Sequence, residues 1–169
     1  SQIFKVGGIQ AIAAMTFGTE TVPKVYKIFG PGNQYVTVAK QIATQYQVSI
    51  DMPAGPSELL VVADESANPA YVASDLLSQA EHGADSQVIL VTTYAPMLEL
   101  VKQEIEIQLN LLPRKEIAEK AMDNSRMIFF ETNEESIHFI NQYGPEHYII
   151  CVKEEQLYID QITNAGSVF

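Results

Sequence analysis

Short, nearly continuous apolar runs are the feature that most constrains how this chain of 169 residues folds. Three of them have the length of a β-strand: ELLVV at residues 58–62, QVILV at 87–91 and HYIICV at 147–152. A strand that is apolar on both faces is buried on both faces, which is typical of a parallel sheet covered by helices. The segments between these runs have the periodicity of amphipathic helices. The alternation therefore predicts an α/β fold with a doubly wound, mostly parallel sheet.

The expected elements alternate along the whole chain. We expect helices at residues 8–16, 35–46, 70–82, 97–111, 114–122, 134–141 and 154–162, and strands at 25–29, 58–62, 87–91, 127–130 and 147–152. The joint MPAGP at residues 52–56 contains two prolines and a glycine, which favour an extended connection rich in turns. We therefore place a boundary between two sheet systems there, which divides the chain into domains at residues 1–57 and 58–169.

The composition argues against several classes of partner. The formal net charge of −11 disfavours nucleic acid, because phosphate binding needs a basic surface, and it disfavours an anionic membrane surface. No apolar run approaches the ~20 residues of a membrane span, and the N-terminal SQIFKVGG lacks the features of a signal peptide. A single cysteine excludes an internal disulfide. We therefore expect a cytoplasmic protein, and the abrupt end at AGSVF indicates part of a longer one.

The turn IFGPGN at residues 28–33 is one candidate ligand site. Ligands of open α/β sheets bind beyond the carboxyl ends of strands, next to helix N-termini that favour anions. Gly30 and Gly32 let a phosphate approach the backbone at such a place. The spacing G-x-G-x-x-G is absent here, however, and a purely structural turn is the alternative.

Gln79 and His82 are a candidate metal-binding pair. They are spaced i and i+3 at the expected end of a helix, so their side chains leave the same face with Cβ atoms roughly 5–6 Å apart. Imidazole is an ordinary zinc ligand, whereas glutamine is an unusual one. The alternative is that His82 only occupies a helix C-terminus, which favours cations, with Gly83 as the cap.

Glu146 and His147 lie at the start of the last long apolar run, directly after the turn Gly144-Pro145. Adjacent residues of a strand face opposite sides of a sheet, so both serve one site only if they lie in the turn, before regular pleating begins. Histidine is the commonest general base, and a neighbouring carboxylate is able to activate water. The alternative is an ordinary polar start of a strand. Cys151 lies inside the apolar run and is expected to be a small buried hydrophobe.

Taken together, several blocks of this sequence resemble the histidinol dehydrogenase family. The matching blocks, in family order, are VGGIQAIAAMTFGTETVPKVYKIFGPGN, IDMPAGPSELLVVAD, ASDLLSQAEHGADSQVILVT, NQYGPEHYII and NAGSVF. The resemblance extends over essentially the whole chain, and because a full-length member is more than twice as long, it identifies the chain as a central portion. It implies a zinc-dependent homodimer with two Rossmann-like domains, of which residues 1–57 hold an incomplete, NAD-binding one and residues 58–169 the second. Such an enzyme oxidises L-histidinol to L-histidine with two NAD⁺, through histidinaldehyde, in the last steps of histidine biosynthesis.

The resemblance also implies roles for individual residues. Gln10 and Asn33 correspond to NAD-contacting positions, and Glu146 and His147 to the catalytic acid–base pair. The positions that correspond to substrate contacts are Ser57, Gln79, His82 and His147.

The implied mechanism uses zinc at Gln79 and His82 to anchor the imidazole and the amine of the substrate. His147 takes the hydroxyl proton while hydride leaves to NAD⁺, and Glu146 activates the water that the aldehyde step needs. The remaining zinc ligands of the family, an Asp and a His, lie beyond Phe169, so we expect this chain alone to be inactive and to bind zinc weakly. Two alternatives are a non-catalytic α/β domain that binds a nucleotide or metabolite, and a structural interaction fragment.

Overall fold

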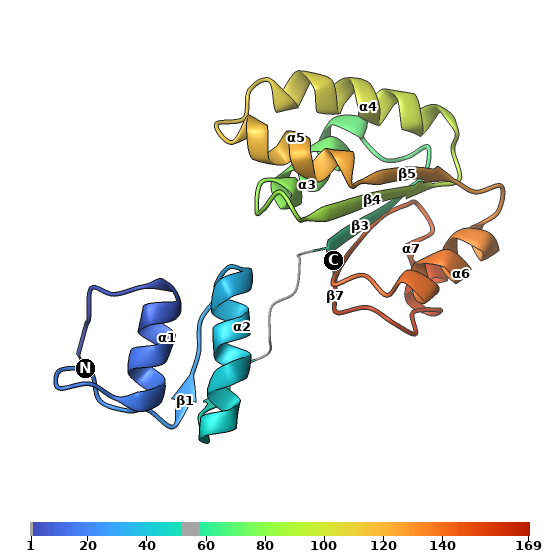
Figure 1. Cartoon of the computed structure of the whole chain (residues 1–169). Helices are drawn as coiled ribbons and strands as arrows, with labels where there is room; N and C mark the ends of the chain where they lie inside the picture. Colours follow the sequence, from blue (N-terminus) through green and yellow to red (C-terminus); the bar gives the residue numbers. More distant parts are fainter. Residues whose placement is uncertain (1, 52–57) are drawn as a thin grey trace. The chain divides into compact units, whose positions relative to one another are not determined.

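The computed structural model describes residues 2–51 and 58–169 (Figure 1). The chain divides into two compact units, Ser1–Gly55 and Pro56–Phe169, called here the first and the second unit. Each unit has its own parallel sheet with helices packed on it. Among the described residues, no helix is both long and apolar enough to cross a membrane.

The first unit is a small two-layer arrangement of helices on a pair of strands. Its elements are helix α1 (Gly8–Phe17), strand β1 (Lys27–Ile28), helix α2 (Gln34–Ala43), a 3-10 turn (Thr44–Tyr46) and strand β2 (Ser49–Ile50). The two strands are parallel, with Ile28 opposite Ile50. The core consists of Ile12, Ile28, Ala43 and Val48. The strand predicted at residues 25–29 is shorter than expected, because β2 provides partners for only two residues of β1.

The second unit is built on a five-stranded sheet with the order β5-β4-β3-β6-β7. Its strands are β3 (Glu58–Ala63), β4 (Gln87–Thr92), β5 (Arg126–Phe129), β6 (His147–Cys151) and β7 (Ser167–Val168). Its helices are α3 (Pro69–Ala80), α4 (Pro96–Leu109), α5 (Lys115–Asp123), α6 (Asn133–Tyr143) and α7 (Glu155–Ile159). All strand pairs are parallel, and the chain moves outward from β3 to β5 before it crosses to β6 and β7 on the other side. This is the order of a Rossmann-like sheet, which confirms the predicted doubly wound α/β fold.

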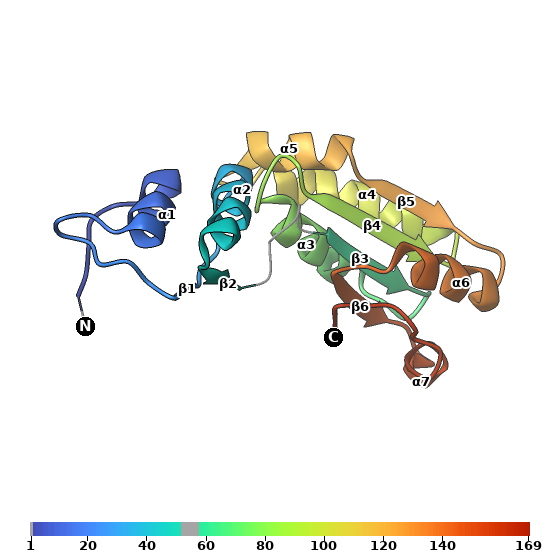
Figure 2. The same ribbon diagram turned by 60° about the horizontal axis from the view of Figure 1, so that its bottom comes forward.

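Helices cover both faces of this sheet: α3, α4 and α5 lie on one face, and α6 and α7 on the other (Figure 2). Leu59 and Val61 of β3 belong to the first core, and Leu60 and Val62 belong to the second. Successive residues of a strand point to opposite faces. Residues 59–62 are therefore all apolar, because each face of β3 meets a layer of helices.

Candidate active site

Glu146 and His147 lie at the amino edge of the second unit's sheet, between the end of α6 and the start of β6. Gly144 ends α6 with φ 63°, a left-handed conformation that glycine adopts without strain. Pro145 is buried, Glu146 lies in the bend that follows, and His147 is the first residue of β6. Glu146 thus precedes the regular pleat, which is the condition under which both side chains serve one site.

The two side chains reach each other. Glu146 Oε1 lies 3.7 Å from His147 Nε2, and the two side chains are 51% and 36% exposed, respectively. The separation is longer than a hydrogen bond but short enough for electrostatic coupling. A carboxylate and an imidazole in this arrangement are able to exchange protons with water or with a substrate at the sheet edge.

The neighbouring strands β3 and β7 hold this pair on both sides. The N–H of Glu58, at the start of β3, donates to Glu146 Oε2 at 3.3 Å. His147 pairs with Leu59 of β3 and with Ser167 of β7, and Ser167 N donates to Glu146 O at 2.8 Å. Glu58 was not predicted in the site, because it is 88 residues from Glu146 and no local pattern signals the contact.

Two further residues shape this edge. Gly166 passes so close to Glu146 that a Cβ at this position would lie 2.5 Å from Glu146 O. Tyr143 Oη donates to Gln87 Oε1 at 2.8 Å. Burial, together with the negative charge of nearby Glu58, raises the pKa of Tyr143 to about 12. Tyr143 is therefore a neutral hydrogen-bond donor near pH 7. No sequence pattern predicted that Tyr143, a helix residue, would lie at this edge of the sheet.

Gln79 and His82 lie where α3 ends. The helix stops at Ala80, two residues before its predicted end, and His82 N donates to Gln79 O at 3.1 Å. Glu81 is the cap of the helix, and Gly83 does not have the positive φ of a glycine C-cap, so the predicted capping role of Gly83 is wrong. The i, i+3 relation survives as a tight turn, with Gln79 buried at 8% exposure and His82 exposed.

This pair lies at the same edge of the sheet as Glu146 and His147. β3 and β4 are parallel, so α3 must return the chain from the carboxyl edge to the amino edge before β4 begins. The sequence-predicted metal pair and the predicted catalytic pair therefore share one edge of one sheet. Ser57, also predicted to contact the substrate, lies outside the described residues.

The donor chemistry of Gln79 and His82 fits zinc in part. An amide oxygen and an imidazole nitrogen are two donors of the four that a tetrahedral site needs. Within the described parts of the chain, no group of three or more His, Cys, Asp or Glu side chains is placed to hold a metal ion. A zinc site at this edge thus needs ligands in addition to these two.

Cys151 lies at the opposite end of β6 from His147. Four steps of a strand separate the two residues, which corresponds to roughly 13 Å. Burial raises the pKa of the Cys151 thiol, and the charges of Asp75 and Asp64 raise it further. The side chain is half-buried rather than fully buried as predicted. The Cys151 thiol therefore does not share a site with His147.

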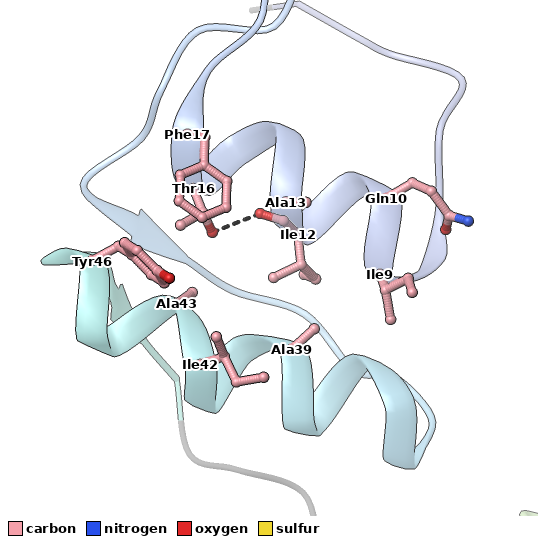
Figure 3. Close-up of a pocket in the computed structure, with 10 residues that line it drawn as sticks. All are labelled: Ile9, Gln10, Ile12, Ala13, Thr16, Phe17, Ala39, Ile42, Ala43 and Tyr46. Atoms are coloured by element: carbon pink, nitrogen blue, oxygen red, sulfur yellow. Dashed lines mark hydrogen bonds between the residues drawn. The ribbon is translucent and has the colours of Figure 1, made fainter.

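In the first unit, Gln10 and Asn33 lie at the starts of α1 and α2, which run side by side in the same direction (Figure 3). Asn33 caps α2, with its Oδ1 accepting from Val36 N at 3.1 Å, and Gln10 is exposed in the first turn of α1. Since α2 follows β1, both helix N-termini lie at the carboxyl edge of the β1–β2 pair. Their partial positive charge favours an anion there.

A cavity of about 300 Å³ lies between α1 and α2 (Figure 3). Its walls are mainly apolar and include Ile9, Ile12, Phe17, Ile42 and Tyr46. The hydroxyl of Thr16, which also lines it, donates to Ile12 O at 2.7 Å. Gln10 is the polar side chain at the end where the helices begin. The cavity is suited to an apolar group, whereas an anion is favoured at the helix N-termini.

The fold and the two sheet edges define an α/β protein of the Rossmann-like class. The family model of histidinol dehydrogenase matches residues 1–169, and the chain belongs to the histidinol dehydrogenase family, as its resemblance predicted. It is 60% identical over 169 residues to the histidinol dehydrogenase of Bacteroides fragilis (strain YCH46), which covers 100% of this chain and 40% of that protein. The chain thus spans well under half the length of this relative.

Solved structures agree with this assignment. The crystal structure of histidinol dehydrogenase from Elizabethkingia anophelis has a TM-score of 0.93 and 61% identity, over 99% of this chain and 39% of that one. Gamma-glutamyl phosphate reductase from Thermotoga maritima matches with a TM-score of 0.56 and 14% identity, over 94% of this chain and 43% of that one. The second likeness concerns the fold alone.

Proposed function

We propose that this chain is the central segment of a histidinol dehydrogenase, which oxidises L-histidinol to L-histidine with two NAD⁺. The observation that carries the proposal is the Glu146–His147 pair, held 3.7 Å apart at the edge of a Rossmann-like sheet in a member of this family. An accessible imidazole beside a carboxylate suits both the removal of a hydroxyl proton and the activation of water.

In the first oxidation, His147 accepts the proton of the substrate hydroxyl while the hydride leaves the same carbon for NAD⁺, which gives histidinaldehyde. His147 is only partly buried, so it passes this proton on to solvent. Glu146 compensates the positive charge that the imidazole acquires, because its carboxylate lies within a few ångströms.

The second oxidation requires a water molecule to add to the aldehyde before another hydride is able to leave. Glu146 accepts a proton from this water, which forms the hydrate, and His147 accepts a hydroxyl proton of the hydrate as the second hydride departs. Glu146 and His147 have then each accepted one proton and NAD⁺ one hydride, so the product is the carboxylate of L-histidine. This route needs no thiol, in agreement with the position of Cys151 at the far end of β6.

The ligand sites follow the two sheet edges. Zinc, when bound, anchors the imidazole and amine of the substrate, and Gln79 and His82 provide two of its ligands. The further ligands come from parts of the homodimeric enzyme outside this chain. Gln10 and Asn33 contact NAD⁺ at the paired helix N-termini of the first unit, and Ser57 contacts the substrate. The support for the NAD⁺ site is the anion-favouring end of α2.

The test is a chimera in which residues 1–169 replace the matching 40% of the Bacteroides fragilis enzyme. We expect the chimera to reduce NAD⁺ when histidinol is added, and the 169-residue chain alone to be inactive and to bind zinc weakly in calorimetry. Glu146→Gln should slow the oxidation of histidinaldehyde more than that of histidinol.

A different result would favour the alternative function, a nucleotide-binding domain without catalysis. A chimera that folds like its parent and binds NAD⁺, yet oxidises neither histidinol nor histidinaldehyde, would show a nucleotide-binding domain without a catalytic role. Turnover of histidinol by the isolated 169-residue chain at the rate of the full-length relative would refute its description as an incomplete segment.

A further inference from the structure

A buried lysine binds the backbone of the candidate nucleotide-binding turn in the first unit. Lys40 is 4% exposed, and its Nζ donates to Gly30 O at 2.9 Å and pairs with the carboxylate of Asp51. The second oxygen of this carboxylate, Asp51 Oδ2, accepts from Gly30 N at 2.7 Å. One ion pair thus holds both backbone polar groups of Gly30.

The turn that this pair holds has an unusual backbone. Gly30 has φ 138°, in the region where a residue with a Cβ is strained. Two residues on, Gly32 packs so tightly that a Cβ would lie 2.4 Å from the side chain of Val36. Asn33 then caps α2 through Val36 N. Glycine adopts this conformation without strain but is also free to leave it, and the hydrogen bonds with Lys40 and Asp51 hold Gly30 in place.

Asp51 occupies the position at which a Rossmann unit has its ribose-binding acidic residue. In a Rossmann unit, an acidic residue at the end of the second strand, about 20 residues after the first glycine of the turn, binds the ribose of NAD. Asp51 directly follows β2 and lies 21 residues after Gly30. Here the carboxylate of Asp51 instead binds Lys40 and the Gly30 N–H. The positive charge of Lys40 would suit a phosphate, but the side chain is buried.

We propose that Lys40 and Asp51 are positioning residues for the dinucleotide, which lock the Gly30 turn so that the N-terminus of α2 and Asn33 face NAD⁺. Neither charged side chain contacts the nucleotide in this arrangement. The inference rests on the proposed function, in which this turn contacts NAD⁺. In agreement with it, the hydrogen bond from Lys40, followed by that from Gly30 N–H, lowers the pKa of Asp51.

Three substitutions in the chimera separate the charge of the pair from its hydrogen bonds to Gly30. Asp51→Asn keeps an oxygen for the Gly30 N–H but loses the charge, Asp51→Ala loses both, and Lys40→Met keeps the apolar stem. We expect KM for NAD⁺ to rise on the order of 10- to 100-fold in Asp51→Ala, because a turn displaced by about an ångström loses its contacts. The rise should be smaller in Asp51→Asn, and kcat at saturating NAD⁺ and KM for histidinol should change little in both.

Two controls keep loss of folding apart from loss of positioning. Val48→Ala removes core volume from the same unit but leaves both side chains that bind Gly30 in place, so it should lower the melting temperature but leave KM for NAD⁺ unchanged. The double variant Lys40→Met/Asp51→Asn buries no unpaired charge, so it should recover the melting temperature while KM for NAD⁺ stays high. Hydrogen exchange of the Gly30 amide reports the turn directly and should accelerate most in Asp51→Ala.

The outcomes separate this inference from the proposed function. Suppose that the unsubstituted chimera is active, and that Asp51→Ala frees the Gly30 amide but leaves KM for NAD⁺ unchanged. This result overturns the positioning role alone. Equal increases of KM in Asp51→Ala and Val48→Ala overturn it as well, because they indicate a general loss of structure. A folded, unsubstituted chimera without NAD⁺-dependent turnover overturns the proposed function, and this inference with it.

Discussion

The candidate site residues of the two units lie at opposite edges of their parallel sheets. In the first unit, Gln10 and Asn33 lie at the carboxyl edge, where helices begin. In the second unit, His82 and the Glu146–His147 pair lie at the amino edge, after the ends of α3 and α6. Open α/β sheets usually bind ligands at their carboxyl edges, so the proposed site of the first unit follows this rule and that of the second unit departs from it.

The charge at the helix ends gives a physical reason for this difference. A helix N-terminus carries a partial positive charge, which suits the phosphates of a dinucleotide, whereas a helix C-terminus carries a partial negative charge, which suits a metal cation or an imidazolium. Gln79 lies in the last turn of α3 and His82 just beyond it, and His147 follows the end of α6. Each edge therefore favours ligands of the sign that its proposed function requires.

The carboxyl edge of the second unit is closed by the chain itself. Asp64, directly after β3, accepts hydrogen bonds from Ser66 N at 2.8 Å and from Ser66 Oγ at 2.6 Å. Its other oxygen accepts from Lys153 N, after β6, at 2.9 Å. β3 and β6 are the strands between which the strand order reverses, so these bonds occupy the place where a Rossmann-like sheet usually receives its ligand.

Substitution at the two ends of β6 is expected to show the largest contrast between the edges. His147→Asn in the chimera should lower kcat for histidinol by roughly 10²- to 10⁴-fold, the usual effect of losing a general base. Cys151→Ala, at the other end of the same strand, should leave kcat unchanged. Steady-state kinetics of NADH formation measure both. A loss of similar size in Cys151→Ala would mean that the thiol takes part in the chemistry and that the edges are not distinct.

Gly166→Ala should disturb the amino edge through the backbone alone. The new Cβ would lie 2.5 Å from Glu146 O, so the bend that carries Glu146 has to move. We expect the free energy of unfolding to fall by about 1–3 kcal/mol, as for other overpacked sites, and the oxidation of histidinaldehyde to slow.

Urea denaturation of the 169-residue chain and turnover of the chimera measure the two effects of Gly166→Ala. Gly7→Ala serves as the control for stability, because a Cβ at Gly7 meets nothing within 4 Å. An unchanged stability of Gly166→Ala would show that the strand β7 does not fix the position of Glu146.

The fold class was readable from the sequence because burial on both faces leaves a local mark. The runs ELLVV and HYIICV are apolar at every register position that meets a helix layer. The bend before β6 was also readable, since Gly144 and Pro145 are turn residues whose effect is local. Whether Glu146 lies ahead of the pleat was left open in the sequence, and the structure places it in the bend before β6.

The contacts that hold the site were not readable, because topology rather than local pattern creates them. The bond from Glu58 N to Glu146 joins residues 88 positions apart, and Lys40 reaches Asp51 only because β1 and β2 are neighbours. Nor did the helical spacing of Gln79 and His82 reveal that α3 stops at Ala80. The parallel order of the strands, which determines the shared edge, appears only in the folded sheet.

Asp64→Ala should have the smallest effect and should concern stability alone, because the carboxyl edge of the second unit is closed rather than functional. Burial opposes ionisation of Asp64, but the hydrogen bonds from Ser66 and from Lys153 N–H outweigh it, and its pKa lies below the ordinary 3.8. A carboxylate with a lowered pKa stabilises the fold above its unfolded pKa, and this contribution is lost as the pH falls through the folded value. The substitution should therefore cost about 1 kcal/mol at pH 7, and the difference from the unsubstituted chain should shrink below pH 3.8.

Denaturation of the 169-residue chain at several pH values, with Glu65→Ala as the control for an exposed neighbour, measures the stability effect of Asp64→Ala. Hydrogen exchange of the Lys153 amide should accelerate in the variant at pH 7, because that N–H loses its acceptor. In the chimera, the same substitution should leave KM for NAD⁺ and for histidinol unchanged. An increase in either KM without a loss of stability would place a ligand at the carboxyl edge of the second unit. The two units would then share one binding rule, and the contrast between their edges would be wrong.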